Sequence, residues 1–257
     1  VGKKGATLKN MTATNGATVT LYAKWTPVTY TITCNLAGGS VATANPTSYT
    51  IESNDITLVN PTKTGYTFAG WTGTGLEKAA TSVTIKKGST GNREYTATWT
   101  ANTYNVTLNK NGGTCDELTS YTYAVGATLP TDVTKTGYTF GGWFANSDCT
   151  GSDVTAISNT ATGDKEYWAK WTANTYTVTY NGNGSTGGST AQSTHTYDVA
   201  KALTANGFER KYTVTYNYNG NGDSNTTATA TATFNGWATS ADGAKVYDDK
   251  ASVTNLA

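Results

Sequence analysis

Histidine, methionine and cysteine are scarce in this chain of 257 residues, which has one histidine, one methionine and three cysteines. Zinc sites need clustered Cys and His ligands, so the sequence excludes a zinc-based fold or active site. His195, the only histidine, stands in the stretch "QSTHTYD". Ser193 and Asp198 are its neighbours in sequence, but nothing there marks the strained nucleophile turn of a catalytic triad. We expect His195 to be a solvated strand residue and the chain to have no catalytic residues.

Charge is also sparse. Charged residues make up 14% of the chain, against roughly 25% in ordinary globular proteins. The net charge of +1 gives no basic surface for nucleic acid. No apolar run approaches the roughly 20 residues of a membrane span, and no signal peptide is visible. A first residue of Val1 leads us to expect a processed chain or an excerpt of a longer one. Abundant Thr, Asn, Gly and Tyr favour a secreted, extracellular protein rich in strands.

What the chain does contain is repetition, and a repeated module decides the fold class. The stretch "GYTFAGW" at Gly65–Trp71 returns as "GYTFGGW" at Gly137–Trp143. The closing stretch "EYTATWTANTYNV" at Glu94–Val106 returns as "EYWAKWTANTYTV" at Glu166–Val178. We predict repeat modules at 28–101, 102–173 and 174–257, preceded at 1–27 by the C-terminal part of an incomplete module.

Within a module the hydrophobic period is two, which indicates β-strands with one buried face. Tyr104, Val106 and Leu108 alternate with polar residues, and Tyr95, Ala97 and Trp99 do the same. Residues 121–140 have room for a short helical turn, although Pro130 limits it. The expected fold is mostly β, in the β-rich α+β class, with small modules in tandem. Because the "TAN" linkers at 100–102 and 172–174 are short, we expect an elongated rod.

The third module departs from the other two. Residues 211–234 contain two alternating runs around an Asn-Gly-Asn-Gly turn and predict an inserted β-hairpin. The module also lacks a closing "YAKW" strand, whereas residues 13–27 hold one, with Val19, Leu21, Ala23 and Trp25 on one face. Two interpretations stay open: the chain is an excerpt of a longer array, or residues 13–27 complete the third module of the next copy, head to tail. An open strand edge predicts self-association under both.

A few residues remain as binding candidates. Cys115 and Cys149 lie in two loops of one module, and a disulfide between them is one of two outcomes that the sequence leaves open. Trp168 falls on the polar face of its strand and is the best candidate for contact with glycan or host surfaces, together with Tyr216 and Tyr218 of the hairpin. No cofactor is expected. Calcium is the alternative, because Gly- and Asn-rich loops hold several aspartates: Asp148, Asp153, Asp223, Asp242 and Asp248.

The order and spacing of these stretches resemble the Listeria–Bacteroides repeat, or internalin B-repeat, of bacterial surface proteins. The opening "YTVTYNGNG", the central "GYTF-G-W" and the closing "YAKWT" carry the resemblance. It implies small β-grasp-like units strung in tandem in cell-surface or secreted proteins, usually as spacers, stalks or adhesive segments, and no catalytic residues. The expected function is therefore a non-enzymatic stalk or fibre that associates with itself or with neighbouring repeats. An adhesin that binds host or glycan surfaces is the alternative, and an enzyme comes third.

Overall fold

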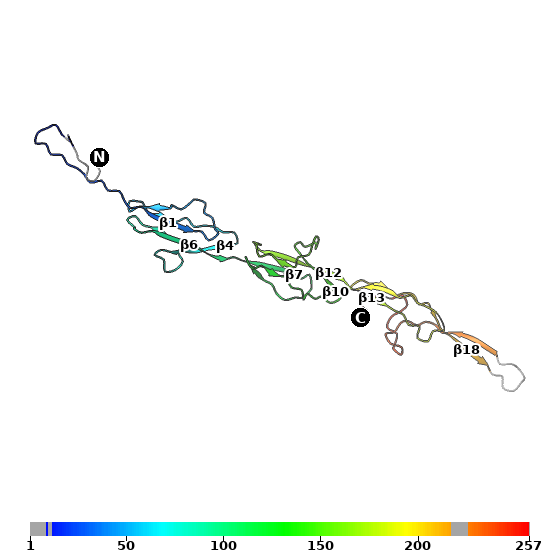
Figure 1. The fold of residues 1–257 in the computed structure, drawn as a ribbon. Coiled ribbons are helices and arrows are strands. Elements are labelled where there is room, and N and C mark those ends of the chain that lie inside the picture. The colour runs from blue at the N-terminus through cyan, green and yellow to red at the C-terminus, as the bar shows by residue number, and fades with distance from the viewer. Residues whose placement is uncertain (1–8, 10–11, 217–225, 257) are drawn as a thin grey trace. The chain divides into compact units, whose positions relative to one another are not determined.

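The computed structural model describes residues 9, 12–216 and 226–256 (Figure 1). The chain divides into two compact units, residues 1–102 and 103–257. The described residues form strands and contain no helix, which confirms the mostly β fold. The helical turn suggested within 121–140 is wrong. That segment forms two short strands, β8 (Ser120–Thr122) and β9 (Ala127–Thr128), with a tight turn between them.

The first unit is built on a four-stranded sheet in the order β2-β1-β6-β4. Its strands are β1 (Tyr30–Asn35), β2 (Ser48–Tyr49), β4 (Tyr66–Gly73) and β6 (Arg93–Ala101). The first strand, β1, runs antiparallel to β2 and parallel to the last strand, β6, whose other edge pairs with β4. A separate ribbon joins β3 (Ile56–Thr57) to β5 (Thr84–Ile85). The last strand therefore lies inside the sheet.

The core of this unit follows the alternation of the sequence. Tyr95 and Ala97 of β6 are buried, and Trp71 of β4 has no exposed surface. Phe68 lies between two tryptophans, with ring centroids 5.6 Å from Trp71 and 5.7 Å from Trp99. The remaining buried residues of the cluster are Ile32, Tyr49, Leu58, Val83 and Ile85.

The residue before the buried Trp71 is Gly70, and the local structure requires a glycine there. The ladder between β4 and β6 shifts register between Phe68 and Gly70. Gly70 has a φ of +136°, and a Cβ there would lie 2.8 Å from the backbone nitrogen of Ala80. Both the bulge and the close approach require a residue without a side chain.

A second four-stranded sheet, in unit 2, has the same arrangement in the order β10-β12-β7-β8. Besides β8 it contains β7 (Thr103–Asn109), β10 (Tyr138–Phe144) and β12 (Lys165–Ala173). Again the first strand, β7, is parallel to the last, β12, and β10 covers the other edge of β12. A ribbon pairs β9 with β11 (Ala156–Ile157). The core of buried residues comprises Val106, Tyr121, Leu129, Val133, Trp143, Ile157, Tyr167 and Ala169.

The rest of unit 2 contains only two-stranded ribbons among its described residues. The pairs are β13 (Thr175–Val178) with β15 (Ser193–Thr196), β14 (Gly187–Gly188) with β17 (Phe208–Glu209), β16 (Lys201–Ala202) with β20 (Ser252–Val253), and β18 (Lys211–Tyr216) with β19 (Thr226–Thr231). The antiparallel β18–β19 hairpin is exposed along both strands. The predicted module boundaries themselves remain a prediction.

Candidate functional site

A groove beside β13 distinguishes residues 174–257 from the two four-stranded sheets. The strand β13 corresponds to β1 and β7 and pairs with β15 as they pair with β2 and β8. On the other side, where β6 and β12 lie in the complete sheets, no strand of the described residues pairs with β13. The site therefore has an open strand edge.

The far wall of the groove is the segment 232–238, which corresponds to β4 and β10. Trp237 bridges to Tyr247 as Trp71 bridges to Ala80 and Trp143 to Val154. In the described structure this wall segment has that bridge and a hydrogen bond from the Ala232 N–H to the Arg210 carbonyl, whereas β4 and β10 pair along their length with β6 and β12. Between the wall and the edge of β13 the groove has a volume of about 880 Å³.

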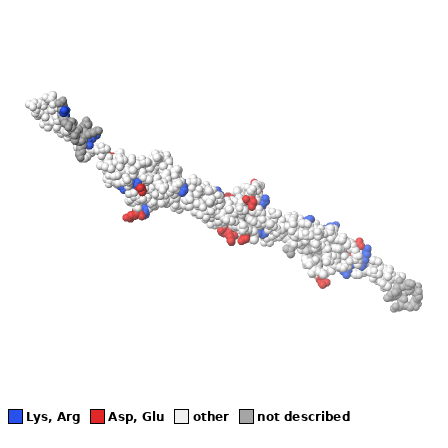
Figure 2. Space-filling model, in the orientation of Figure 1, with Lys and Arg blue, Asp and Glu red and all other residues white. Residues whose placement is uncertain are grey.

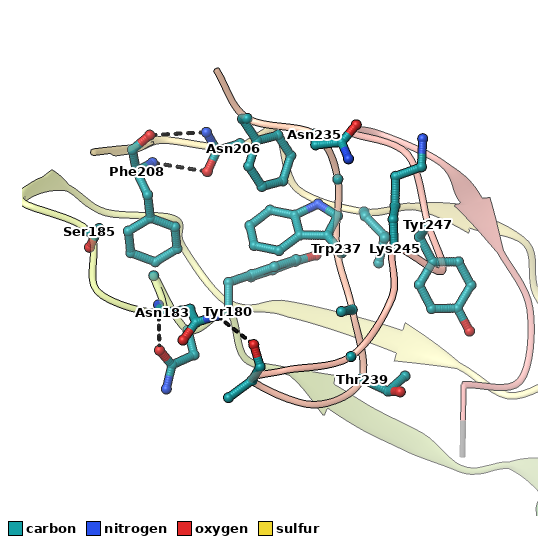
Figure 3. Close-up of a pocket in the computed structure, with 18 of the residues that line it drawn as sticks. Tyr180, Asn183, Ser185, Asn206, Phe208, Asn235, Trp237, Thr239, Lys245 and Tyr247 are labelled. Atoms are coloured by element: carbon teal, nitrogen blue, oxygen red, sulfur yellow. Dashed lines mark hydrogen bonds between the residues drawn. The ribbon is translucent and has the colours of Figure 1, made fainter. Parts of the chain in front are cut away.

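Aromatic rings line the groove (Figure 3). The Trp237 ring lies 4.7 Å from Tyr180 and 4.8 Å from Phe234, measured between centroids. Phe234 corresponds to Phe68 and Phe140, which each contact two tryptophans. Phe234 contacts only Trp237 among the described rings and is 37% exposed. The site thus holds two of the three equivalent rings that Phe68, Trp71 and Trp99 form in a complete sheet, and Tyr180 and Phe208 add further ring contacts to Trp237.

Trp237 also has an unused hydrogen-bond donor. Its Nε1 is buried and has no partner within the described structure. In the complete sheets, by contrast, Trp71 Nε1 donates to Asn60 Oδ1 at 3.0 Å, and Trp143 Nε1 donates to the Pro130 carbonyl at 2.9 Å. A buried donor without an acceptor is costly, and in the complete sheets the acceptors come from the segment before β4 or β10, not from the last strand.

His195 is buried, and the expectation of a solvated strand histidine is wrong. Only 1% of its surface is exposed, because it occupies the core position of Tyr49 and Tyr121 opposite the first strand of each sheet. The alternating pattern shows which residues of the strand share a face, but it does not show which of the two faces is buried. Asp198 does not contact it; its carboxylate accepts hydrogen bonds from Tyr138 and Asn255.

A chain of hydrogen bonds leads into this histidine. The Thr204 backbone N–H donates to Tyr180 Oη at 2.8 Å, the Tyr180 and Ser193 hydroxyls lie 3.0 Å apart, and Ser193 Oγ lies 2.9 Å from His195 Nε2. Burial raises the pKa of the Tyr180 hydroxyl, but the hydrogen bonds from Ser193 and Thr204 outweigh this effect and hold the pKa below its ordinary value. His195 Nδ1 is left without a partner among the described residues. The network is therefore structural and ends in one unused polar atom.

The predicted donor segment is exposed and has no strand assignment. Val19 is 42%, Leu21 67% and Trp25 87% exposed, and Ala23 is exposed as well. Tyr22, which lies between Leu21 and Ala23, is 88% exposed, so exposure is not confined to the alternating residues, and the role of residues 13–27 stays a prediction. Sequence reasoning identified the segment but missed Tyr180, Phe234 and Trp237, although "TFNGW" at 233–237 matches the repeated "TF-G-W".

The other predicted positions lie apart from one another. Trp168 is half-buried and lies opposite Phe144 in the β10–β12 ladder. Tyr216 is 53% exposed at the end of β18, and Tyr218 lies outside the described residues. With Tyr216, the hairpin exposes two further large apolar residues that the sequence did not single out, Tyr212 and Val214.

No disulfide joins Cys34, Cys115 or Cys149 in this structure. Cys34 and Cys115 pack against the cores of their sheets, and burial raises the pKa of both thiols. Cys149 lies in a turn with its Sγ near the carbonyls of Trp168 and Ala169. A Cys115–Cys149 disulfide stays a prediction.

Polar chemistry is dispersed over the molecule. Within residues 9, 12–216 and 226–256, no three His, Cys, Asp or Glu side chains gather to hold a metal ion; Asp223 lies outside these ranges, and calcium binding stays a prediction. On the face seen in Figure 2, acidic and basic residues are interspersed among other residues. Over the same described ranges, no helix is long and apolar enough to cross a membrane.

Comparison with known proteins gives matches over most of this architecture. A family model described as the Listeria-Bacteroides repeat domain matches residues 30–100 and 104–170. A protein of Evansella cellulosilytica named "Putative Gly-rich membrane protein" is 30% identical over 166 residues, or 65% of this chain and 19% of that protein. Another from the same organism, "Putative membrane protein", is 28% identical over 229 residues, or 88% of this chain and 31% of that protein. The chain thus spans less than a third of either relative, and no solved structure matches it.

Proposed function

Because the chain belongs to the Listeria-Bacteroides repeat domain family, we propose that it is a non-enzymatic structural segment of a bacterial extracellular protein. It serves as a stalk or fibre at the cell surface. The family match over two successive repeats and the names of two relatives as membrane proteins support this placement.

One feature of the two complete sheets carries the proposal: the first and last strands of each are parallel neighbours. The ladder joins Ile32–Asn35 to Arg93–Thr96 in one sheet and Val106–Asn109 to Lys165–Trp168 in the other. Tension along the chain pulls such a pair in opposite directions along its own axis. All the ladder hydrogen bonds are then loaded together in shear, whereas strands pulled apart from one end break their bonds in succession. This geometry suits a segment that transmits force.

The linker within unit 2, residues 172–174, is held by hydrogen bonds to the segments on either side of it. The Asn174 N–H donates to the Gly137 carbonyl, and the Asn174 carbonyl accepts from the Tyr197 N–H, both at 2.9 Å. Tyr138 adds a hydrogen bond from its hydroxyl to Asp198 at 3.0 Å and a ring contact with Tyr197. Successive repeats joined in this way transmit load better than repeats on a free tether.

Single-molecule force spectroscopy tests the proposal. Handles at Val28 and Asn102 load the β1–β6 ladder in shear, and handles at Thr67 and Thr100, which face each other across β4 and β6, peel that pair from one end. We expect a clearly higher unfolding force for the first geometry, and about 240 Å of chain released per module at about 3.4 Å per residue. Equal forces in the two geometries would contradict a load-bearing role.

We also propose that copies associate head to tail, with residues 13–27 of one copy completing residues 174–257 of the next. The open edge of β13 and the exposed apolar run at 19–25 support this proposal. A heterologous contact of this kind builds a filament when its rotation does not close into a ring. Sedimentation velocity over a range of concentrations tests it: growing oligomers are expected, and a monomer at all concentrations would contradict it.

An adhesin is the second candidate, favoured by the β18–β19 hairpin. Tyr212, Val214 and Tyr216 are 47%, 40% and 53% exposed, and aromatic faces of this kind stack on sugars. Binding of the full chain to a panel of immobilised glycans tests this function, with Tyr216→Ser and Trp168→Ala as variants. Loss of glycan binding in a folded variant supports the adhesin, and a chain that binds none of the panel removes it.

A further inference from the structure

We infer that each of the two complete repeats has a binding cleft for a sugar that carries a carboxylate, such as a uronic acid. In the first repeat the cleft has a volume of about 520 Å³, and its lining includes Lys63 and the rings of Tyr66, Phe68 and Trp99. Ligand pockets in proteins commonly enclose about 300–1,000 Å³, so the cleft has room for a sugar residue. The site depends on neither head-to-tail assembly nor the β18–β19 hairpin.

The ammonium group of Lys63 is fixed in this cleft but has no counter-ion among the described residues. Its Nζ lies 4.4 Å from the centroid of the Tyr66 ring and 5.7 Å from that of the Trp99 ring. It donates one hydrogen bond, 3.0 Å long, to the Ala37 carbonyl, and an ammonium group has three donors. No described carboxylate forms an ion pair with it, and it is the only charged residue that lines the cleft. A half-buried positive charge is therefore left with two donors for a ligand.

The second repeat builds the same arrangement from an identical stretch. The residues "TKTGYTF" of the first cleft return at 134–140. Lys135 Nζ lies 4.3 Å from the centroid of the Tyr138 ring and 5.8 Å from that of the Trp171 ring. It donates to the Asn111 carbonyl at 3.0 Å. The cation is thus held by the same two rings and by the same turn in both complete repeats.

Residues 174–257 keep the positive charge but use a different residue. Arg210 takes the position of Lys63 and Lys135, because the carbonyl of the residue before each of them accepts a hydrogen bond from the loop after the first strand. The Arg210 guanidinium carbon lies 5.3 Å from the centroid of the Tyr212 ring.

The comparison separates two roles of the cation. Within the described structure the Arg210 side chain donates no hydrogen bond to the turn, unlike the two lysines. A cation over an aromatic ring is therefore common to all three places, whereas the bond that holds the turn is not. A role limited to holding the turn does not require this charge, but recognition of an anion does.

The groups in the cleft suit an acidic sugar better than a simple anion. A carboxylate on the sugar ring accepts charge-assisted hydrogen bonds from the two remaining donors of Lys63. The C–H groups on the face of a sugar ring pack on aromatic rings, and its hydroxyls find partners in Ser40, Thr62 and Thr64, which also line the cleft. Inorganic phosphate or a peptide carboxylate uses the charge but leaves the aromatic rings uncovered.

Binding of the full chain to immobilised polygalacturonic acid, a polymer of one uronic acid, tests the site. Two further polymers separate the charge from the sugar ring: the methyl ester of the same polymer keeps the rings without the charge, and polyglutamate keeps the carboxylates without the rings. Physiological salt, with a Debye length of about 8 Å, screens non-specific attraction. We expect roughly 10-fold weaker binding, or less, to either of the other two polymers, as for loss of one hydrogen bond to a charged group.

Two lysine pairs give matched variants. Lys63→Met with Lys135→Met removes the charge from both clefts, and Lys78→Met with Lys87→Met removes the same net charge from exposed positions. We expect at least roughly 10-fold weaker binding for the first pair and unchanged binding for the second. Acetylation of the unaltered chain gives a measurement that does not depend on how a variant folds. Polygalacturonic acid should protect Lys63 and Lys135 from acetylation and leave Lys78 reactive.

Several results would overturn the site. A chain that does not bind polygalacturonic acid, or lysines that are acetylated equally with and without it, would remove the cleft as a binding site. Equal binding of the methyl ester would show that the charge plays no part, and equal binding of polyglutamate would show that the sugar ring plays none. Equal loss in the two pairs of variants would mean that net charge alone attracts the polymer. The shear and sedimentation measurements are independent of these results.

Discussion

Gly113→Ser gives the sharpest test of how the last strand is held in a complete module. A Cβ on Gly113 would lie 2.3 Å from Trp171 Cζ2 and 3.0 Å from the Thr134 carbonyl oxygen. The indole ring would have to move by about 1 Å to reach ordinary contact, since the backbone on the other side cannot yield. Gly113 has no left-handed φ, so the effect comes from crowding alone.

The magnitude follows from two losses. Overpacking of a core site costs roughly 1–3 kcal/mol. Displacement of the ring also breaks the 2.9 Å hydrogen bond from Trp171 Nε1 to the Lys110 carbonyl, which is worth about 1 kcal/mol. Together the two effects lower the free energy of opening the β7–β12 ladder by roughly 2–4 kcal/mol.

Hydrogen–deuterium exchange of the full chain, read on peptides from β12, measures this change without requiring two-state unfolding. Exchange should accelerate roughly 30- to 1,000-fold. The matched control is Gly141→Ser in the same module, where the nearest atoms belong to the flexible Lys170 side chain at 3.4 Å, and little change is expected. Equal protection in the two variants would refute the claim that the last strand is locked by its tryptophan against a glycine.

Two further predictions concern single side chains. Hydrogen bonds from the Lys86 side chain and from the Lys87 N–H hold the pKa of the Asp55 carboxyl below its ordinary value. The stabilisation of the fold by ionised Asp55 is therefore complete above the ordinary pKa and is lost as the pH falls through the lowered pKa. Lys86→Met should raise the pKa of Asp55 in an NMR titration, and an unmoved pKa would contradict this cause. Cys34 and Cys115 should react with iodoacetamide more slowly than a free cysteine at the same pH, because burial raises both pKa values; equal rates would show that the thiols are open to solvent.

Local patterns in the sequence predicted the strands and their buried faces well. Alternation in 94–100 correctly indicated that Tyr95 and Ala97 face the core, and the repeated "GYTF-G-W" lies on β4 and β10. These features depend on residues close in sequence, which periodicity and turn chemistry can report.

Long-range pairing could not be predicted in the same way. Nothing in the sequence of β1 shows that its partner is β6, some sixty residues away, so the parallel pair that supports a mechanical role was not foreseen. Burial of His195 was missed because an alternating strand has two faces, and the tyrosines at the matching positions are chemically unlike histidine. The sequence did show that residues 174–257 lack the last strand of the other modules, and the candidate site lies at the position of that strand.

Electron microscopy of the purified chain, beside a chain that lacks residues 1–27, tests the central claim most directly. Strand donation into the groove of residues 174–257 predicts that the full chain forms fibres that lengthen with concentration, while the shortened chain stays as single particles. Single particles for both chains, or fibres for both, would contradict the account, because residues 19–25 would then play no part in assembly.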